Sequence, residues 1–299
     1  MALIAGPTAS GKTALALHLA KTRNIVIINA DSAQVYSDLP ILSAQPSPQE
    51  LDSAPHRLFG YLDGTKPCSA AQWAADAKLE IASAHQLGAL PVLVGGTGLY
   101  LRTLLDGIAP IPEIDPLLRA AIRGLVVADA YAELRGYDPE MAAMLSPTDS
   151  SRIARALEVV KATGRSIADW RRDKVGGISD AVDLRPVLLL PPRDWLYQRC
   201  DERFDTMMKS GAIPEVSALL ARQIPGDAPV MRAIGVREIS ACLSGDLTHE
   251  EAIKLGKIAT RQYAKRQYTW FRNQSPAGWA RFEDIISIEN RDKIETILQ

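Results

Sequence analysis

Cysteine and histidine are scarce in this chain of 299 residues, which contains three cysteines and four histidines. The cysteines, Cys68, Cys200 and Cys242, lie far apart in the sequence. A disulfide framework and a structural zinc site both need such residues at characteristic spacings. The sequence therefore indicates neither kind of site.

Net charge and long apolar runs are also lacking. The 34 Lys and Arg residues nearly balance the 35 Asp and Glu residues, which gives a formal net charge of −1. A nucleic-acid partner would therefore have to meet locally clustered positive charge. No apolar run approaches the length of a membrane span, and the first expected strand follows Met1 directly. We expect no membrane partner, no signal peptide and a cytoplasmic location.

A glycine-rich stretch near the start of the chain carries the clearest chemical signal. It lies between an apolar run at residues 2–5, which predicts a strand, and a helical pattern that begins at Ala14. Its spacing is that of a P-loop, in which two glycines enclose four residues and Lys and Thr follow. The stretch consists of Gly6, Pro7, Thr8, Ala9, Ser10, Gly11, Lys12 and Thr13.

Phosphate binding requires these residue types. Glycines let backbone N–H groups converge on phosphate oxygens at the N-terminus of a helix. Lys12 would reach the terminal phosphate, and the Thr13 hydroxyl would join the coordination shell of Mg²⁺. Because the loop binds oxygens and not the group attached to them, the pattern predicts phosphate binding without identifying the compound.

Four further apolar runs predict strands of an α/β sheet. In such sheets ligands bind at the carboxyl ends of the strands, so polar residues that follow a run are candidates for the site. The segment 43–55 is rich in Pro, Ser and Gln and predicts a loop. The four runs are residues 24–30, 58–63, 90–94 and 184–190.

Three positions at the ends of these segments could face a ligand. Asp31 follows the run at 24–30 and is either a helix N-cap or a site residue. Thr97 follows two adjacent glycines after the run at 90–94, where backbone can approach a ligand closely. His56-Arg57, at the end of the predicted loop, would more simply be a solvated pair.

A region without convincing strands interrupts the α/β pattern. We interpret residues 113–182 as a small all-helical domain inserted into a P-loop α/β core, a parallel sheet with flanking helices made of residues 1–112 and 183–299. Arg152 and Arg155 share one face of a helix expected there, as a solvated pair or as a phosphate contact. The expected helices of the insert are residues 115–126, 128–135 and 151–163.

The densest positive stretch lies on a helix expected from Thr248 onward. Basic and aromatic residues mixed in this way could bind a nucleic-acid backbone and stack on bases. An amphipathic helix with its aromatic residues in the core would give the same pattern. The cations are Lys257, Arg261, Lys265, Arg266 and Arg272, and the aromatic residues are Tyr263, Tyr268, Trp270 and Phe271.

Taken together, six motifs in this order resemble the tRNA dimethylallyltransferases, and the resemblance extends over nearly the whole chain. They are GPTASGKT (6–13), DSAQVY (31–36), GGTGLY (95–100), SRIARALEV (151–159), RAIGVR (232–237) and KRQYTWFR (265–272).

The resemblance implies transfer of a dimethylallyl group from dimethylallyl diphosphate to the exocyclic amine of the adenine 3′-adjacent to the anticodon in tRNA. The P-loop, assisted by Arg232, would then hold the diphosphate. Lys12, Thr13 and Mg²⁺ would stabilise the charge that builds on this leaving group. Asp31 would be the base that accepts the amine proton. The adenine would have to flip out of the anticodon loop to reach it.

The same resemblance implies a set of tRNA contacts, and we expect a monomeric enzyme. Two departures from the family pattern weaken individual assignments: Arg57 replaces a second histidine, and Ser151 replaces a glutamine. The implied contacts are Asp31, Ser32, Ala33, Gln34, Thr97, Arg119, Ser151, Arg152, Arg155, Arg232, Arg237, Lys265, Arg266 and Arg272.

Two other functions are compatible with parts of the pattern. A P-loop small-molecule kinase would share the P-loop and the insert, with Arg152 and Arg155 closing on ATP, but it has no use for a basic aromatic helix. A non-catalytic RNA-binding protein would not need Lys12, Thr13 and Asp31 together.

Overall fold

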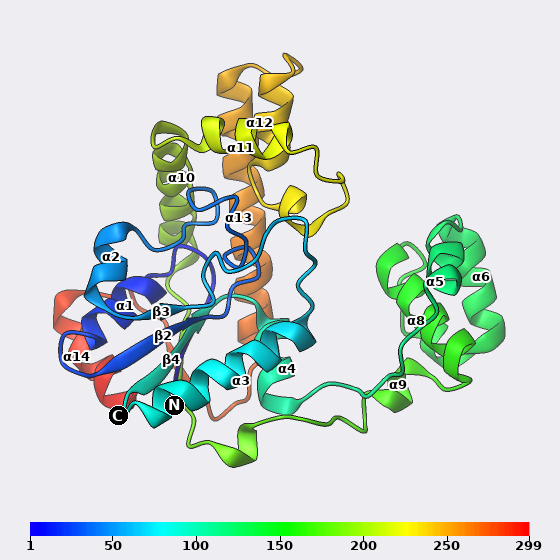
Figure 1. Cartoon of the computed structure of the whole chain (residues 1–299), viewed down its shortest axis with the longest axis horizontal. Helices are drawn as coiled ribbons and strands as arrows, with labels where there is room; N and C mark the ends of the chain where they lie inside the picture. The colour runs from blue at the N-terminus through cyan, green and yellow to red at the C-terminus, as the bar shows by residue number, and fades with distance from the viewer. Residues whose placement is uncertain (299) are drawn as a thin grey trace. The chain divides into compact units, whose positions relative to one another are not determined.

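The computed structural model describes residues 1–298, apart from the side chain of Ile288. The chain divides into two compact units, one made of residues 1–104 with residues from 179 onward, the other of residues 105–178 (Figure 1). Among the described residues, no helix combines the length and the apolar character needed to cross a membrane.

A parallel sheet of six strands forms the centre of the larger unit, as the alternating pattern predicted, in the order β3-β2-β4-β1-β5-β6. Its central strands are apolar and buried, because helices cover both faces of such a sheet. Ala5 at the end of β1 lies opposite Gly95 of β4 and Leu188 of β5, so the strands end together. The strands are β1 (Ala2–Ala5), β2 (Ile25–Asn29), β3 (His56–Arg57), β4 (Leu90–Gly95), β5 (Arg185–Leu189) and β6 (Ala280–Phe282).

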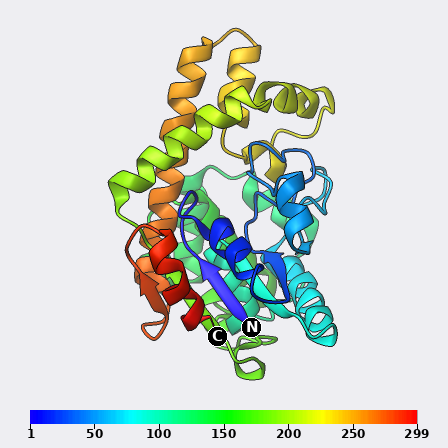
Figure 2. The ribbon, with the colours of Figure 1, turned by 90° about the vertical axis from the view of Figure 1, so that its left-hand side faces the viewer.

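Helices of this unit follow the strands and continue in a C-terminal group. α13 is the longest, and it packs against α10 and α12 (Figure 2). The helices are α1 (Lys12–Leu19), α2 (Pro48–Ser53), α3 (Ala70–Gln86), α4 (Gly98–Asp106), α10 (Arg193–Lys209), α11 (Ala212–Ala221), α12 (Val236–Leu243), α13 (His249–Gln274) and α14 (Ile288–Ile297), with short 3₁₀ helices η1 (Ser179–Ala181) and η2 (Pro229–Arg232).

The sequence of α13 explains both its start and its close packing. Thr248 caps the first turn, since its hydroxyl accepts from the Glu251 N–H while the Glu251 carboxylate accepts from the Thr248 N–H. At Gly256 a Cβ atom would lie only 2.1 Å from the ring of Phe204 on α10. The glycine therefore lets the two helices approach closely.

The expected strand at 58–63 is wrong. Leu58 and Gly60 have φ angles of 62° and 52°, which extended chain does not adopt. The Asn29 side-chain amide donates to the Leu58 carbonyl at 2.9 Å and holds this turn in place. The edge strand is instead the short β3, and Leu62 makes only an isolated bridge to Tyr36.

The expected loop at 43–55 is also partly wrong, because it contains α2. Ser47 caps this helix and Pro48 occupies its first turn, where the missing N–H of proline costs no hydrogen bond. Glu50 completes the capping box through the Ser47 N–H at 2.8 Å.

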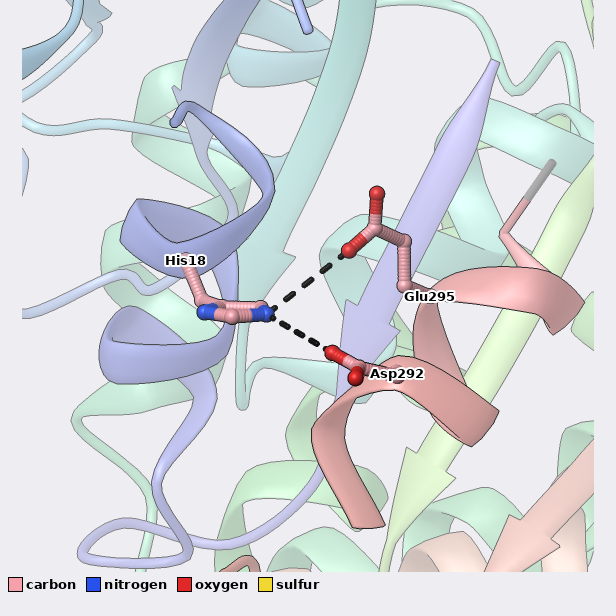
Figure 3. Close-up of side chains that lie close together, drawn as sticks. All are labelled: His18, Asp292 and Glu295. Carbon is pink, nitrogen blue, oxygen red and sulfur yellow. Dashed lines mark ion pairs between the residues drawn. The ribbon is translucent and has the colours of Figure 1, made fainter. Parts of the chain in front are cut away.

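β6 and α14 were not predicted from the sequence. β6 pairs with β5, and α14 buries Ile294 against the core next to α1. At the surface, His18 Nε2 of α1 lies 3.4 Å from Asp292 Oδ1 and 3.7 Å from Glu295 Oε2 of α14 (Figure 3). These ion pairs join the first and last helices of the unit.

The smaller unit is helical, and the three helices expected within it are confirmed. α6 and α8 pack together around Leu134, Ile153 and Leu157. Within its described residues, 105–178, the only β-type pairing is a bridge between Ile108 and Val175. The helices are α5 (Pro116–Arg123), α6 (Val127–Tyr137), α7 (Pro139–Ala143), α8 (Ser150–Thr163) and α9 (Ile167–Trp170).

Candidate active site

The P-loop connects β1 to the N-terminus of α1. Gly6 and Gly11 have φ angles of 153° and 94°, and Ala9 has a φ of 63°. A Cβ atom at Gly6 would lie 2.4 Å from the Leu189 carbonyl oxygen, so this position needs glycine. The resulting backbone encloses a cavity of about 240 Å³ in front of the helix N-terminus.

Lys12 lies in this cavity, and its ammonium group donates to the Pro7 carbonyl at 2.7 Å. Burial lowers the pKa of Lys12 to about 8, although the nearby Asp31 carboxylate opposes the shift. An ammonium group withdrawn from water in this way gains more from an anionic ligand than a solvated one does.

Two hydroxyl groups of the P-loop, those of Ser10 and Thr13, could bind an oxygen-rich ligand. The Ser10 hydroxyl is buried and has no hydrogen-bond partner among the described residues, which is costly unless a ligand supplies one. Thr13 lines the same cavity. Ser10 and Thr13 therefore fit a phosphate group and its counter-ion.

Asp31 lies two residues beyond the end of β2 and is held by groups close to it in the chain. Its Oδ1 atom accepts from the Ala33 N–H at 3.0 Å, and its own N–H donates to the Asn29 side chain at 2.8 Å. Burial raises the pKa of the Asp31 carboxyl, against the lowering effects of the Ala33 N–H, Lys12 and Arg203. Because Oδ1 is occupied by the Ala33 N–H, Oδ2 remains to accept a proton.

Thr97 lies beside Asp31 and fixes the next residue of the chain. Its hydroxyl accepts from the Ser32 N–H at 2.9 Å, and its own N–H donates to the Ala30 carbonyl at 3.1 Å. The glycine at 95 permits this, because a Cβ atom there would lie 2.1 Å from the backbone of Ala30. The two strand ends are thus joined at the site.

Gln34, an expected tRNA contact, lines the P-loop cavity and also holds a neighbouring loop in place. Its side-chain amide donates to the carbonyls of Ser43 and Ala44 at 2.9 and 2.7 Å. Both donors are therefore used to hold the loop that forms one wall of the site, which leaves only the side-chain oxygen of Gln34 for a ligand.

A second cavity, of about 360 Å³, adjoins the first. Leu39, Leu42, Phe204, Met207 and Val230 make much of its wall apolar. Five residues line both cavities, and among them are a carboxylate, a hydroxyl and a guanidinium group. The shared residues are Thr8, Asp31, Ser43, Ala44 and Arg203.

Arg199 and Arg203 of α10 belong to the site, although the sequence did not predict this. Both line the P-loop cavity, and Arg203 donates to the Thr8 hydroxyl at 3.2 Å. Burial lowers the pKa of Arg203, yet a guanidinium group stays charged at neutral pH. Their i, i+4 spacing indicates that the two arginines share one face of a helix. It does not indicate that this face packs against the P-loop.

α13 divides its residues between core and site. Tyr268 and Phe271 are buried, as the amphipathic interpretation predicted, and Lys257 forms an ion pair with Asp205 at 2.7 Å. Tyr263 and Arg266 line the second cavity. Burial and the nearby Asp31 carboxylate raise the pKa of Tyr263.

Of four exposed cations predicted to contact the substrates, only Arg232 lines a cavity of the site. Arg232 lines the second cavity and donates to the Asp227 carbonyl at 2.8 Å, but it is not among the residues that line the P-loop cavity. Arg237, Lys265 and Arg272 are exposed and have no ion-pair partner among the described residues.

The smaller unit holds three arginines around one fully buried carboxylate. Glu158 lies 2.8 Å from Arg123, 3.3 Å from Arg155 and 3.9 Å from Arg119. The three arginine side chains remain 40–63% exposed, so the group presents surplus positive charge. Nearby on α8, Ser151 is exposed and Arg152 lies 3.4 Å from Asp149.

One His and two carboxylates could in principle surround a cation. His18, Asp292 and Glu295 offer ligand atoms within 4.8 Å of one another. Mg²⁺ prefers oxygen ligands, and the side chains of Thr13, Asp31 and Glu50 bring oxygens to the P-loop cavity instead. The surface cluster is explained by the ion pairs that join α1 to α14.

Comparison with known proteins gives one consistent result. A family model described as IPP transferase matches residues 34–274. The chain is 57% identical over 304 residues to a tRNA dimethylallyltransferase from Sphingopyxis alaskensis, which covers 100% of this chain and 99% of the relative. It is 58% identical over 277 residues to a tRNA dimethylallyltransferase from Novosphingobium aromaticivorans, covering 93% and 98% of the two chains.

The similar solved structures are of transferases that carry related names. The chain is similar to the tRNA isopentenylpyrophosphate transferase from Bacillus halodurans, with a TM-score of 0.70, 34% identity and coverage of 99% and 93%. It also resembles a eukaryotic dimethylallyltransferase acting on tRNA, with a TM-score of 0.79, 29% identity and coverage of 91% and 69%.

Proposed function

This chain belongs to the IPP transferase family, and we propose that it transfers a dimethylallyl group from dimethylallyl diphosphate to the exocyclic amine of the adenine 3′-adjacent to the anticodon in tRNA. One observation carries the proposal. A phosphate-binding cavity and a partly apolar cavity adjoin, and Asp31 lines both.

The diphosphate occupies the P-loop cavity. Lys12, Arg199 and Arg203 neutralise its charge there, and the Ser10 hydroxyl gains the partner that it lacks. Thr13 would hold Mg²⁺ in this cavity, and the ion would supply further stabilisation of the leaving group. The dimethylallyl group lies in the neighbouring cavity against Leu39, Phe204 and Met207.

The reaction exchanges one bond for another. The bond between the allylic carbon and the diphosphate oxygen breaks, and its electron pair leaves with diphosphate. The adenine nitrogen forms a bond to the same carbon and loses a proton, which Asp31 accepts. The raised pKa of Asp31 brings its basicity closer to neutral pH, where a general base is most effective.

The adenine reaches the cavity by flipping out of the anticodon loop. Ser32, Ala33 and Thr97 border its site, because Thr97 fixes Ser32 beside Asp31. Arg232, Arg237, Lys265, Arg266 and Arg272 contact the RNA backbone around the opening. The helical unit, for which the sequence suggests limits of 113 and 182, contributes Arg119, Ser151, Arg152 and Arg155.

We further propose that the enzyme works as a monomer in the cytoplasm. One copy of the chain supplies the P-loop, Asp31 and the apolar wall that the proposed reaction uses. The cytoplasm is where its tRNA acceptor is found.

Incubation of the protein with Mg²⁺, unmodified tRNA and labelled dimethylallyl diphosphate tests the proposal. Label should appear in tRNA, and Asp31→Ala should abolish most of the transfer. A parallel reaction with labelled ATP and small acceptors tests for kinase activity. Phosphate transfer from ATP without prenylation of tRNA would contradict the proposal.

A further inference from the structure

We infer that Gln267 is a positioning residue, which holds the P-loop and the loop before Thr97 in the relative placement that the transfer needs. This inference rests on the proposed function. Gln267 lies on α13 between Arg266 and Tyr268, but it points inward and is only 6% exposed.

Both ends of the Gln267 side chain are hydrogen-bonded, to two different loops. Its oxygen accepts from the Thr8 N–H at 2.7 Å, and its nitrogen donates to the Gly96 carbonyl at 2.9 Å. These partners are 259 and 171 residues away in the sequence. A Cβ atom at position 96 would lie 2.2 Å from the Gln267 nitrogen, so the glycine there is needed for the contact.

The two partners lead directly to the reacting groups. Thr8 lines both cavities, and its hydroxyl accepts from Arg203, which borders the diphosphate site. Gly96 precedes Thr97, which fixes the residue next to Asp31. One amide group therefore connects the leaving-group site with the site of the base.

Only an amide of this length satisfies both partners. Methionine has a similar shape but offers neither the donor nor a strong acceptor. An ionised glutamate could still accept from the Thr8 N–H, but it would place a negative charge against the Gly96 carbonyl. A protonated glutamate, by contrast, could donate to that carbonyl and accept from Thr8, much as glutamine does.

The test measures single-turnover prenyl transfer, with labelled tRNA limiting and with enzyme and dimethylallyl diphosphate in saturating excess. Gln267→Met should lower the rate constant about tenfold, because small misplacement of reacting groups is costly. Its Kd for tRNA should change less than about twofold, a rate-against-affinity split that general destabilisation would not produce. Gln262→Met, at an exposed position on the same helix, serves as the matched control and should leave both quantities unchanged.

Gln267→Glu provides a second readout that remains usable if the methionine variant fails to fold. Its rate relative to the wild type at the same pH should rise as the pH falls, because protonation restores the donor. A wild-type rate in Gln267→Met, or a constant Glu-to-wild-type ratio across pH, would overturn the inference. Absence of transfer by the wild-type protein would instead contradict the proposed function, so the two failures are distinguishable.

Discussion

The α/β core and the helical unit use opposite ways of holding charge. In the core, Lys12 and Asp31 face a cavity, are withdrawn from bulk water, and contact mainly neutral backbone groups. In the helical unit, Glu158 is buried and holds three arginines whose side chains remain exposed. The first arrangement shifts pKa values and favours chemistry, whereas the second presents stable positive charge and favours binding of a polyanion.

Loss of the proposed base, Asp31, should have the largest effect on turnover. It would show most clearly that the α/β core carries the chemistry and the helical unit does not. Asp31→Ala should reduce turnover on the order of a hundredfold or more, because no other group takes the amine proton. Its tRNA affinity, measured by filter binding, should stay nearly intact. Asp52→Asn, at an exposed position, is the control, and an Asp31 variant with normal turnover would remove the residue from this role.

Removal of the buried ammonium group should come next. Lys12→Ala should weaken binding of dimethylallyl diphosphate about tenfold or more, since a charge-assisted contact is lost. In the wild type, the affinity should fall as the pH rises beyond about 8, because Lys12 then loses its proton.

Calorimetric titrations at several pH values measure both effects, and the decline near this pH should be missing in Lys12→Ala. The exposed Lys21→Ala should behave like the wild type. The pKa of Lys12 is about 8, so the affinity should differ between pH values below and above it. A wild-type affinity for dimethylallyl diphosphate that does not change across this range would contradict the role of Lys12 in binding.

In the helical unit, Glu158→Gln should act on stability rather than on chemistry. Loss of the buried charge that joins three arginines should lower the free energy of unfolding by about 1–3 kcal/mol. The rate of prenyl transfer under saturating substrates should remain close to normal. Denaturant unfolding measures the loss of stability, and Glu113→Gln, at an exposed position, is the control. Equal stability of the two variants would mean that Glu158 does not hold the three arginines in the way described.

The exposed cations of α13 should affect binding alone. Replacing Arg266 and Arg272 with Ala should reduce the slope of log affinity for tRNA against log salt by about one per lost phosphate contact. Titrations over a range of salt concentrations measure this slope. If it does not change, these two residues belong to the solvated face of the helix.

The smallest effect is expected at the surface ion pairs of Figure 3. His18→Ala should lower the free energy of unfolding by less than about 1 kcal/mol, because Asp292 is 84% exposed and such pairs are screened by water. Thermal unfolding measures it. A larger loss would mean that α14 depends on this contact for its place beside α1.

The sequence predicted those parts of the site that depend on local chain geometry. The P-loop and Asp31 follow buried strands, and strand periodicity alone brings them to one sheet edge. The β-branched runs likewise predicted the central strands of the sheet. The strand expected at 58–63 failed because hydrophobicity does not reveal the positive φ angles of Leu58 and Gly60.

Arg203 and Gln267, which reach the site through packing, were not predicted from the sequence. Arg203 and Gln267 contact Thr8 only because α10 and α13 fold back onto the P-loop from about two-thirds and nine-tenths of the way along the chain. Nothing in their neighbouring residues indicates this partner. The tRNA contacts and the role of Asp31 stay predictions that rest on the family and the geometry.

The pH dependence of the single-turnover rate tests the central claim most directly. With tRNA limiting and with enzyme and dimethylallyl diphosphate in saturating excess, the wild-type rate should fall on acidification through one ionisation. The pKa of this ionisation should lie above the ordinary value of an aspartate, because protonated Asp31 cannot accept the amine proton. Asp31→Asn should be slow and lack this ionisation. The same profile in wild type and Asp31→Asn would contradict the assignment of Asp31 as the base.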